Sequence, residues 1–412
     1  MFLLNVATTF LYNSDFFNIK NHLLKIISNF AKQKKSIMKK IQMVDLKGQY
    51  EKIKEKVNAS IQEVLDTTTY INGPLVHEFQ KNLEEYLDVK HVIPCANGTD
   101  ALQIAMMALD LKPGDEVITA DFTFAATVEV IALLQLTPVL VDVEEANMNI
   151  SIEAIRKAIT PKTKAIVPVH LFGRAANMEA IMAIANEHNL YVIEDNAQAI
   201  GANCKFSDGT KKKAGTIGHV ASTSFFPSKN LGCYGDGGAI FTNDDELAHK
   251  IRGIVNHGMY VRYHHDVVGV NSRLDSIQAG VLNAKLPFLD EYSKARQNAA
   301  RKYSFAFEGH KNIIAPSICE ICDCHVFHQY TLRIIDADRN GLMQHLLDKG
   351  IPCAIYYPIP LHSQKAYADE RYNEADFPVT NKLVNEVLSL PMHTELDDEQ
   401  IKFITDSVLE FL

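Results

Sequence analysis

The sequence has no long apolar run, no basic stripe and no even, clustered set of cysteines that would indicate a disulfide framework,. No segment approaches the roughly 18 consecutive apolar residues of a membrane helix, and internal repeats are missing too. Seven cysteines, an odd number, are scattered over 412 residues, which favours a reducing compartment. The net charge of −9 arises from interspersed acidic and basic residues, so neither nucleic acid nor a membrane is an expected partner.

The N-terminus lacks two parts of a secretory signal peptide. The stretch MFLLNVATTFLYNSDFF has no positive region before its apolar run and no clear small-residue cleavage site,. A second methionine, Met38, opens MKKIQMVDLKGQY, and we expect translation to start there. Residues 1–37 are then an N-terminal extension, flexible or artefactual, and a cytoplasmic location is expected.

Short apolar segments between residues 91 and 243 are predicted to be strands. They are rich in valine and isoleucine and mostly continuous, which is typical of strands buried on both faces. Helical patterns such as TDALQIAMMALDL lie between them. This alternation predicts an α/β fold with a mostly parallel sheet and helices on both faces. The predicted strands cover residues 91–97, 116–120, 138–143, 164–171, 191–195, 220–226 and 238–243.

The pattern changes after about Asn283. A long helical stretch leads to a strand within 326–334, a helix at GLMQHLLDKG, a strand at PCAIYY and a final helix from Asp397. We therefore predict a large domain over residues 38–285 and a smaller α+β domain over residues 286–412.

Three segments at predicted strand ends could carry chemistry, because ligands of parallel α/β sheets bind beyond the carboxyl ends of the strands. In ANGTDAL, Gly98 and Thr99 open a helix whose free N–H groups suit a phosphate,. In IEDNAQAIGA, Glu194 and Asp195 end an apolar strand, where an acid is costly unless it is paired,. In SFFPSKNLG, Lys229 has partly apolar surroundings, which lower the pKa of a lysine and let it act as nucleophile or base,.

Each segment also has a simpler interpretation. The first two are compatible with ordinary helix caps, and any single lysine is most often a surface residue with a buried stem. Taken together, however, a phosphate cradle, an acid for a cationic ring nitrogen and a lysine for an aldehyde are what pyridoxal 5′-phosphate requires. The three segments therefore predict one cofactor site.

At these residues the chain, from about Met38 to its end, resembles the DegT/DnrJ/EryC1/StrS family of PLP-dependent nucleotide-sugar aminotransferases. The resemblance implies PLP fold type I, the fold of aspartate aminotransferase, with a mostly parallel seven-stranded sheet and a smaller α+β C-terminal domain. The matching stretches keep their order along the chain: VDLKGQY, NGTDAL, DFTFAAT, PVHLFG, IEDNAQAIGA, SFFPSKNLGCYGDGGAI, RYHHDVVGVNSRLDSIQAG and YYPIPLH.

The resemblance implies roles for the cofactor-binding residues. Lys229 would bind the cofactor aldehyde covalently and transfer protons, Asp195 would hold the pyridine nitrogen, and Gln198 would lie near the ring hydroxyl. Phe124 would stack on the ring, although a core position in the next helix is an alternative. The phosphate would be bound by Gly98, Thr99 and Ser224.

The resemblance also implies a homodimer with shared active sites. Asn271 would reach the phosphate in the neighbouring subunit, and Arg273 would bind a substrate carboxylate there. Tyr357 and His362 are further candidates for substrate binding. The substrates would be an amino acid, L-glutamate, and a nucleotide-linked keto-sugar, in two half-reactions on one site.

Within the family, the motifs look closest to the branch that acts on UDP-2-acetamido-2-deoxy-3-oxo-glucuronate in bacterial surface polysaccharide (lipopolysaccharide, O-antigen) synthesis. Two positions depart from that branch: Tyr356 stands where a histidine is expected, and KNLG, with Asn230, stands in place of KPLG. The alternative substrate is a dTDP-3-keto- or 4-keto-6-deoxyhexose.

Other functions were weighed against the same residues. A sugar dehydratase of this fold would carry histidine in place of Lys229, and a silent regulatory protein would have no need of the set Lys229, Asp195 and Gln198. The segment CEICDCH, residues 319–325, has ligand-like spacing, but structural zinc sites usually combine two separated pairs. No metal is therefore predicted.

Overall fold

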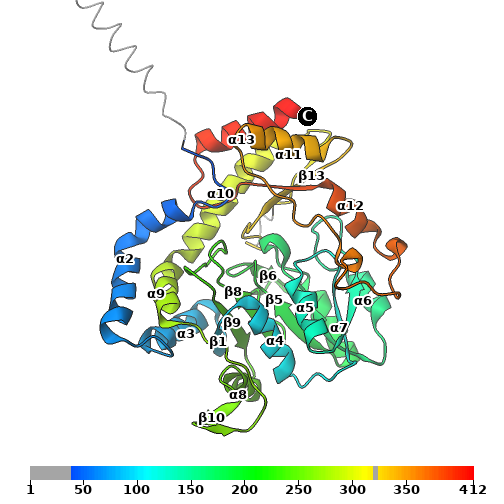
Figure 1. The fold of residues 1–412 in the computed structure, drawn as a ribbon. Coiled ribbons are helices and arrows are strands. Elements are labelled where there is room, and N and C mark those ends of the chain that lie inside the picture. The colour runs from blue at the N-terminus through cyan, green and yellow to red at the C-terminus, as the bar shows by residue number, and fades with distance from the viewer. Residues whose placement is uncertain (1–38, 319–322) are drawn as a thin grey trace, which may run out of the picture. The chain divides into compact units, whose positions relative to one another are not determined.

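The computed structural model describes residues 39–318 and 323–412, of which residues Gln42–Leu412 form one compact unit. Its centre is a seven-stranded sheet in the order β1-β9-β8-β5-β4-β2-β3, shown in Figure 1. Only β9 runs antiparallel to its neighbours. The strands are β1 (His91–Cys95), β2 (Glu116–Ala120), β3 (Thr137–Val141), β4 (Thr163–Val167), β5 (Tyr191–Asp195), β8 (Val220–Ser224) and β9 (Gly238–Thr242). The predicted sheet is confirmed.

The strand sequences explain why helices cover both faces of this sheet. Side chains of a strand alternate between its faces, and in β2 the adjacent residues Val117 and Ile118 enter two different apolar cores. The same alternation places Val92 and Ile93 of β1 in separate cores. Continuous apolar runs are thus required, as in other sheets buried on both faces.

One face of the sheet is covered by α4 (Gly98–Ala108), α5 (Ala126–Leu133) and α8 (Asp245–Ile254). The other face is covered by α6 (Ile152–Ala158) and α7 (Met178–His188) at one end, and by α3 (Pro74–Leu87) and α9 (Ser276–Lys285) at the other. Outside them, α2 (Leu46–Thr67) packs on α9.

Edge position explains the proline in β1. Pro94 has no N–H to donate, and β1 has only one neighbour in the sheet, β9. Proline is tolerated on edge strands for this reason.

The C-terminal part is built around a small antiparallel sheet in the order β12-β13-β14. Its elements are α10 (Leu289–Phe307), β12 (Ile313–Ile314), β13 (Tyr330–Ile334), α11 (Arg339–Asp348), α12 (Pro378–Glu386), β14 (Val387–Leu390) and α13 (Asp398–Phe411). Figure 1 shows α10, α11 and α13 close together. The division into domains 38–285 and 286–412 stays a prediction; its boundary falls at the end of α9.

One strand prediction in this part was wrong, and one strand was not predicted. The segment PCAIYY makes only one isolated bridge, from Ala354 to Ser389, because its two tyrosines line a pocket instead of joining a sheet. β13 pairs with β12 and with β14, and β14 was not predicted from the sequence. Within 326–334, only Tyr330–Ile334 is strand.

Short elements complete the fold. These are β6 (Asn203–Lys205) with β7 (Lys211–Lys213), β10 (Met259–Val261) with β11 (His264–His265), η1 (Leu171–Gly173), η2 (Leu286–Phe288), η3 (Leu361–Ser363) and η4 (Glu374–Asp376). Every helix within the described residues is too short or too polar to span a lipid bilayer.

Candidate active site

The three segments singled out in the sequence follow β1, β5 and β8, and they meet in one pocket of about 530 Å³. These strands run parallel to one another, so their carboxyl ends share one edge of the sheet,. The pocket is lined by Asn97, Gly98, Thr99, Leu102, Phe124, Ala126, Val169, Phe172, Asp195, Ala197, Gln198, Ser224, Phe226, Ser228, Lys229, Asp236, His328, Gln329, Tyr356 and Tyr357.

Lys229 lies in the loop between β8 and β9, and its amine has little water around it. Loss of hydration lowers the pKa of Lys229 to about 8, an effect that the negative charge of Asp195 opposes. Within the described part of the chain, Lys229 Nζ makes neither an ion pair nor a side-chain hydrogen bond. A large fraction of the amine is therefore neutral and nucleophilic near pH 8.

Two buried side chains hold this lysine-bearing loop in place. Asn230 Nδ2 donates to the carbonyl of Val326 at 2.9 Å, and Lys285 Nζ donates to the carbonyl of Gly232 at 2.6 Å. The asparagine of KNLG thus makes a contact that a proline could not make.

Asp195 is the carboxylate that faces the pocket. Its Oδ2 accepts from Thr127 Oγ1 at 2.7 Å, and its Oδ1 accepts from the N–H of Ala197 at 3.1 Å. Thr127 comes from α5 and Ala197 from the turn after β5. Both oxygens are oriented, and each retains acceptor capacity for a further donor.

Glu194, the neighbouring acid, lies on the other side of β5 and serves the fold. Its two oxygens accept from the N–H groups of Gly215, Ile217 and Gly218 at 2.6–2.8 Å and from His170 at 2.9 Å. Burial opposes ionisation, but His170 and the N–H groups outweigh it and lower the pKa of Glu194. Alternation along the strand therefore gives the two acids different roles.

The start of α4 forms the anion-binding end of the pocket. Asn97 caps the helix by accepting from the N–H of Asp100 at 2.8 Å, which leaves the N–H groups of Gly98 and Thr99 without partners in the helix. A Cβ on Gly98 would lie 2.7 Å from Cβ of Ser224. Glycine thus lets the end of β8 bring the Ser224 hydroxyl beside the helix start, a suitable cradle for phosphate.

Gln198 and the aromatic residues form the opposite wall. Gln198 Oε1 accepts from the N–H of Phe172 at 2.6 Å, and its Nε2 donates to the hydroxyl of Tyr357 at 3.2 Å. Phe172 stacks on Tyr357 with ring centroids 6.5 Å apart, and its φ of 57° is costly for a bulky residue,. Phe124 lines the same pocket and is 57% exposed, so it is not a core residue of α5.

Three predicted residues lie outside this pocket. Asn271 is exposed and forms an isolated bridge with Asn256, and Arg273 follows two residues later. His362 is buried: its Nδ1 lies 2.7 Å from Oδ2 of Asp121, and its ring stacks on Phe377 at 4.4 Å. In this chain His362 anchors the segment after Tyr357 to the end of β2.

Other residues were not predicted to belong to the site: Phe172, Asp236, His328, Gln329 and Tyr356, which line the pocket, and Thr127, which donates to Asp195. Thr127, Phe172 and Asp236 fall within the motifs DFTFAAT, PVHLFG and GCYGDGG, so their position near the predicted residues was a usable signal. His328 and Gln329 come from the segment before β13, far along the chain. No local pattern marks them.

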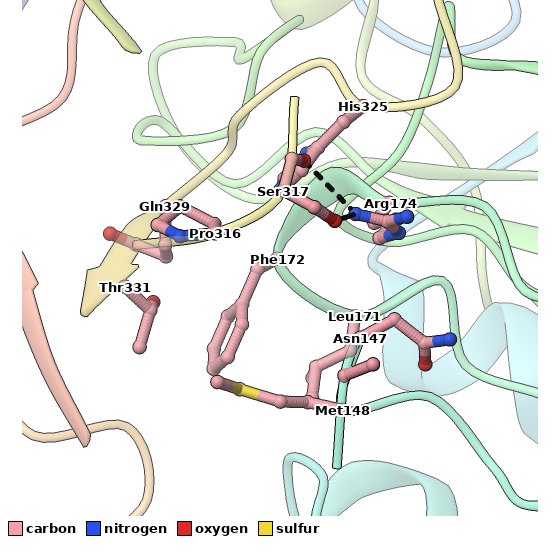
Figure 2. A pocket seen from close by; sticks show the side chains of 11 residues that line it. Asn147, Met148, Leu171, Phe172, Arg174, Pro316, Ser317, His325, Gln329 and Thr331 are labelled. Atoms are coloured by element: carbon pink, nitrogen blue, oxygen red, sulfur yellow. Dashed lines mark hydrogen bonds between the residues drawn. The ribbon is translucent and has the colours of Figure 1, made fainter. Parts of the chain in front are cut away.

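A second cavity of about 30 Å³ borders on the larger pocket, because Phe172 and Gln329 line both. Figure 2 shows this cavity with Arg174 at its edge, where Nη1 donates to the carbonyl of Ser317 at 3.1 Å. Its size suits a water molecule rather than a substrate.

The cysteine-rich segment gives no metal site within the described residues. Cys319 and Cys322 lie outside them, so the interpretation of CEICDCH as a ligand set rests on residues that the structure does not describe. Among residues 39–318 and 323–412, no group of three or more histidine, cysteine or acidic side chains could hold a metal ion.

The residues of the large pocket fit pyridoxal phosphate. The start of α4 and Ser224 offer donors to a phosphate, the oriented carboxylate of Asp195 suits a protonated ring nitrogen, and the neutral amine of Lys229 suits an aldehyde,. The absence of a Cβ at Gly98 keeps the phosphate end open.

Comparison with known proteins identifies the family. The profile of the DegT/DnrJ/EryC1/StrS aminotransferase family matches residues 51–409. UDP-2-acetamido-2-deoxy-3-oxo-D-glucuronate aminotransferase of Pseudomonas aeruginosa is 48% identical, over 88% of this chain and 98% of its own. UDP-N-acetyl-3-dehydro-alpha-D-glucosamine 3-aminotransferase of Acidithiobacillus ferrooxidans is 44% identical, over 88% of this chain and 95% of its own.

Solved structures agree with this result. NtdA from Bacillus subtilis with bound cofactor PMP superimposes with a TM-score of 0.80 at 31% identity, over 87% of this chain and 82% of its own. The fold is PLP fold type I, the cofactor is pyridoxal 5′-phosphate and the chain is a transaminase. The protein belongs to the DegT/DnrJ/EryC1/StrS aminotransferase family.

Proposed function

We propose that this aminotransferase transfers the amino group of L-glutamate to C3 of UDP-2-acetamido-2-deoxy-3-oxo-glucuronate, a step in the synthesis of a bacterial surface polysaccharide. The observation that carries this proposal is the similarity, over nearly the full length, to two enzymes named for UDP-linked 3-oxo sugars. UDP-sugars are made in the cytoplasm, so we place the protein there.

The pocket residues divide the chemical work. Pyridoxal phosphate, when bound, supplies the aldehyde that receives the amino group and a ring that withdraws electrons from the reacting carbon. The carboxylate of Asp195 keeps the ring nitrogen protonated, and the amine of Lys229 removes and returns protons at the reacting carbon. The oriented oxygens of Asp195 and the lowered pKa of Lys229 support these roles.

We propose that Phe124 stacks on the cofactor ring and that Gln198 lies near the ring hydroxyl. Tyr357 is the substrate-binding candidate that the pocket retains: its hydroxyl accepts from Gln198 and keeps its own hydrogen for a ligand,. Tyr356, at the position where the family resemblance implies a histidine, lines the same pocket. His362 contacts Asp121 instead and does not line the pocket.

We further propose a homodimer in which Asn271 and Arg273 serve the neighbouring active site. The surface around them supports this idea. The hairpin β10–β11 and the residues after it expose apolar side chains, with Tyr263 76% and Val268 85% exposed. Figure 1 shows β10 beside α8. Exposed apolar patches of this kind commonly mark a protein interface.

The substrate proposal is tested by glutamate-dependent turnover. Purified protein should consume the oxidised UDP-N-acetylglucosaminuronate at least tenfold faster, in kcat/KM, than dTDP-linked 3-keto- or 4-keto-6-deoxyhexoses, about 1.4 kcal/mol in transition-state binding. Preference for a dTDP-sugar would replace the proposed substrate. Tight sugar binding without turnover of any of them would instead support a regulatory function.

A further inference from the structure

His328 forms part of the pocket wall that Lys229 faces, although no role has been given to it above. It is 6% exposed, and its backbone is tightly held. A Cβ on Gly173 would lie 2.7 Å from the N–H of His328. Val326, two residues earlier, donates to the carbonyl of Gly173 and accepts from Asn230. The position of the imidazole is therefore fixed relative to the lysine-bearing loop.

Arg296 of α10 lies directly behind this wall. It is 3% exposed and has no carboxylate partner within the described residues. Its Nη1 donates to the carbonyls of Phe327 at 3.1 Å, His328 at 3.3 Å and Met392 at 3.0 Å. Burial lowers the pKa of Arg296 to about 10, so the guanidinium stays charged at neutral pH.

Two buried atoms in this arrangement lack hydrogen-bond partners, and they are complementary. Arg296 Nε carries a hydrogen to donate, and His328 Nδ1 can accept one when the imidazole is neutral,. The guanidinium donates through Nη1 to the backbone carbonyl of His328, and its positive charge acts on the imidazole, so the Arg296 side chain lies close to this residue. The Nδ1 atom of the ring is buried away from solvent. The ring lines the pocket, and Nε2 is its other nitrogen.

We propose that Arg296 fixes the tautomer of His328, with Nε–H donating to Nδ1 through one buried water, so that Nε2 carries the hydrogen and presents a donor to the amine of Lys229,. His328 and Arg296 are then positioning residues of the site. The proposal rests on the role of Lys229 given above.

The charges around the imidazole are consistent with this assignment. Burial, together with the positive charges of Lys229 and Arg296, lowers the pKa of His328 well below its ordinary value, so the ring stays neutral. In this tautomer, Nε2 of His328 can only donate, so it cannot accept a hydrogen bond from the ammonium form of Lys229. It can donate to the lone pair of a neutral amine, and this favours the reactive form of Lys229.

The tautomer itself can be observed by NMR spectroscopy. Full-length protein with ¹⁵N-labelled histidine, with and without pyridoxal phosphate, should show the His328 ring with hydrogen on Nε2 and none on Nδ1 throughout pH 6 to 9. The spectrum of a His328→Asn variant assigns the signal among the 16 histidines. Hydrogen on Nδ1, or a doubly protonated ring in this range, would overturn the proposal.

Paired variants test the effect on Lys229. In His328→Gln the side-chain amide donor lies near the position of Nε2 of the native imidazole. In His328→Asn it lies near the position of Nδ1. The pH midpoint for capture of pyridoxal phosphate, followed by absorbance, should stay unchanged in His328→Gln. It should rise by about one pH unit in His328→Asn, a tenfold loss of neutral amine at a given pH below the midpoint.

Arg296 can be tested with a matched pair of variants as well. Arg296→Lys keeps the positive charge but cannot donate in the same plane, so its midpoint should rise as in Arg296→Met. If the midpoint rose in Arg296→Met alone, the charge of Arg296 and not the tautomer of His328 would set the pKa of the Lys229 amine. The proposal would then fail. If circular dichroism shows that the Arg296 variants do not fold, the two His328 variants decide.

Wild-type protein that captures no pyridoxal phosphate would refute the role of Lys229 but leave the tautomer measurement valid.

Discussion

Single residues decide what the pocket can do, and Lys229 shows this most directly. A lysine paired with a carboxylate stays charged, whereas Lys229 makes no ion pair within the described residues and its pKa falls to about 8 through loss of hydration. Asp195 is close enough to oppose this shift, yet its oxygens are already engaged by Thr127 and Ala197. The amine is thus available to a ligand.

The pH dependence of this amine is a first prediction. Because the pKa is near 8, the rate of covalent capture of pyridoxal phosphate should fall about tenfold for each pH unit well below 8 and level off above it. Stopped-flow absorbance measures the rate, and mass spectrometry after borohydride reduction should find the label on Lys229. A Lys250→Ala variant, which removes a surface ion pair with Asp110, should behave as wild type.

The matching variant is Lys229→Ala. It should bind pyridoxal phosphate without the covalent link and lose nearly all transaminase activity, by at least about 10³-fold, since both the nucleophile and the proton carrier are gone. Full activity in a colourless Lys229→Ala protein would contradict the assignment.

The structure brings together those predicted site residues that lie at or just after a strand end. Asp195 and Ser224 are the last residues of β5 and β8, Gly98 and Lys229 come shortly after strands, and the geometry of a parallel sheet brings such ends together,. Thr127 was missed because its hydroxyl reaches Asp195 from a helix, at a distance that depends on packing. Likewise, nothing local marks a histidine that depends on a buried arginine of another helix.

At the scale of elements, the end of β5 is held by a fully buried acid. Glu194 receives hydrogen bonds from three backbone N–H groups of residues 215–218 and from His170, and these contacts fix the strand end from the side opposite Asp195. Because the N–H of Ala176 donates to His170 Nδ1 at 3.0 Å, Nε2 carries the hydrogen given to Glu194.

This pair gives a prediction about stability. Glu194→Gln should lower the free energy of unfolding by about 2–4 kcal/mol, because an amide N–H₂ would face backbone donors at a buried site. Chemical denaturation measures the loss. Asp406→Asn, which removes an exposed ion pair with Lys402, should change it by less than about 0.5 kcal/mol.

The contribution of Glu194 to the free energy of unfolding depends on pH, and the lowered pKa of Glu194 determines the sign of that dependence. A carboxyl whose folded pKa is below its unfolded value of about 4.3 stabilises the fold above that value, and the contribution disappears as the pH falls through the folded pKa. The difference in unfolding free energy between wild type and Glu194→Gln should therefore shrink on acidification below about pH 4. A difference that stays constant down to pH 2 would contradict the role of the charge.

The elements themselves were largely predictable, with one instructive failure. Continuous Val- and Ile-rich runs identified the strands of the central sheet. PCAIYY has the same composition, but its tyrosines are used in the pocket and its chain makes one bridge only. The strand that pairs with β13 is VLSL, the continuation of α12, and such a short run has no periodicity of its own,.

At the scale of the whole molecule, the question is whether one chain supplies all the residues of its active site. Asn271 and Arg273 do not line the pocket that holds Lys229 and Asp195, and the sequence alone could suggest the shared dimer only through the family resemblance. The hairpin β10–β11 and the residues after it expose apolar side chains, which an interface would cover. If the dimer forms as proposed, each site takes residues from both subunits.

Complementation between two inactive variants tests this arrangement. In a mixed dimer of Lys229→Ala and Arg273→Ala subunits, one site would carry both defects and the other neither. Random mixing by co-expression should therefore restore about a quarter of wild-type activity. A mixture of Lys229→Ala and Asp195→Ala subunits, whose residues share one pocket in one chain, should restore none. Equal failure of both mixtures, with a monomeric mass in light scattering, would show that Arg273 acts in its own chain or not at all.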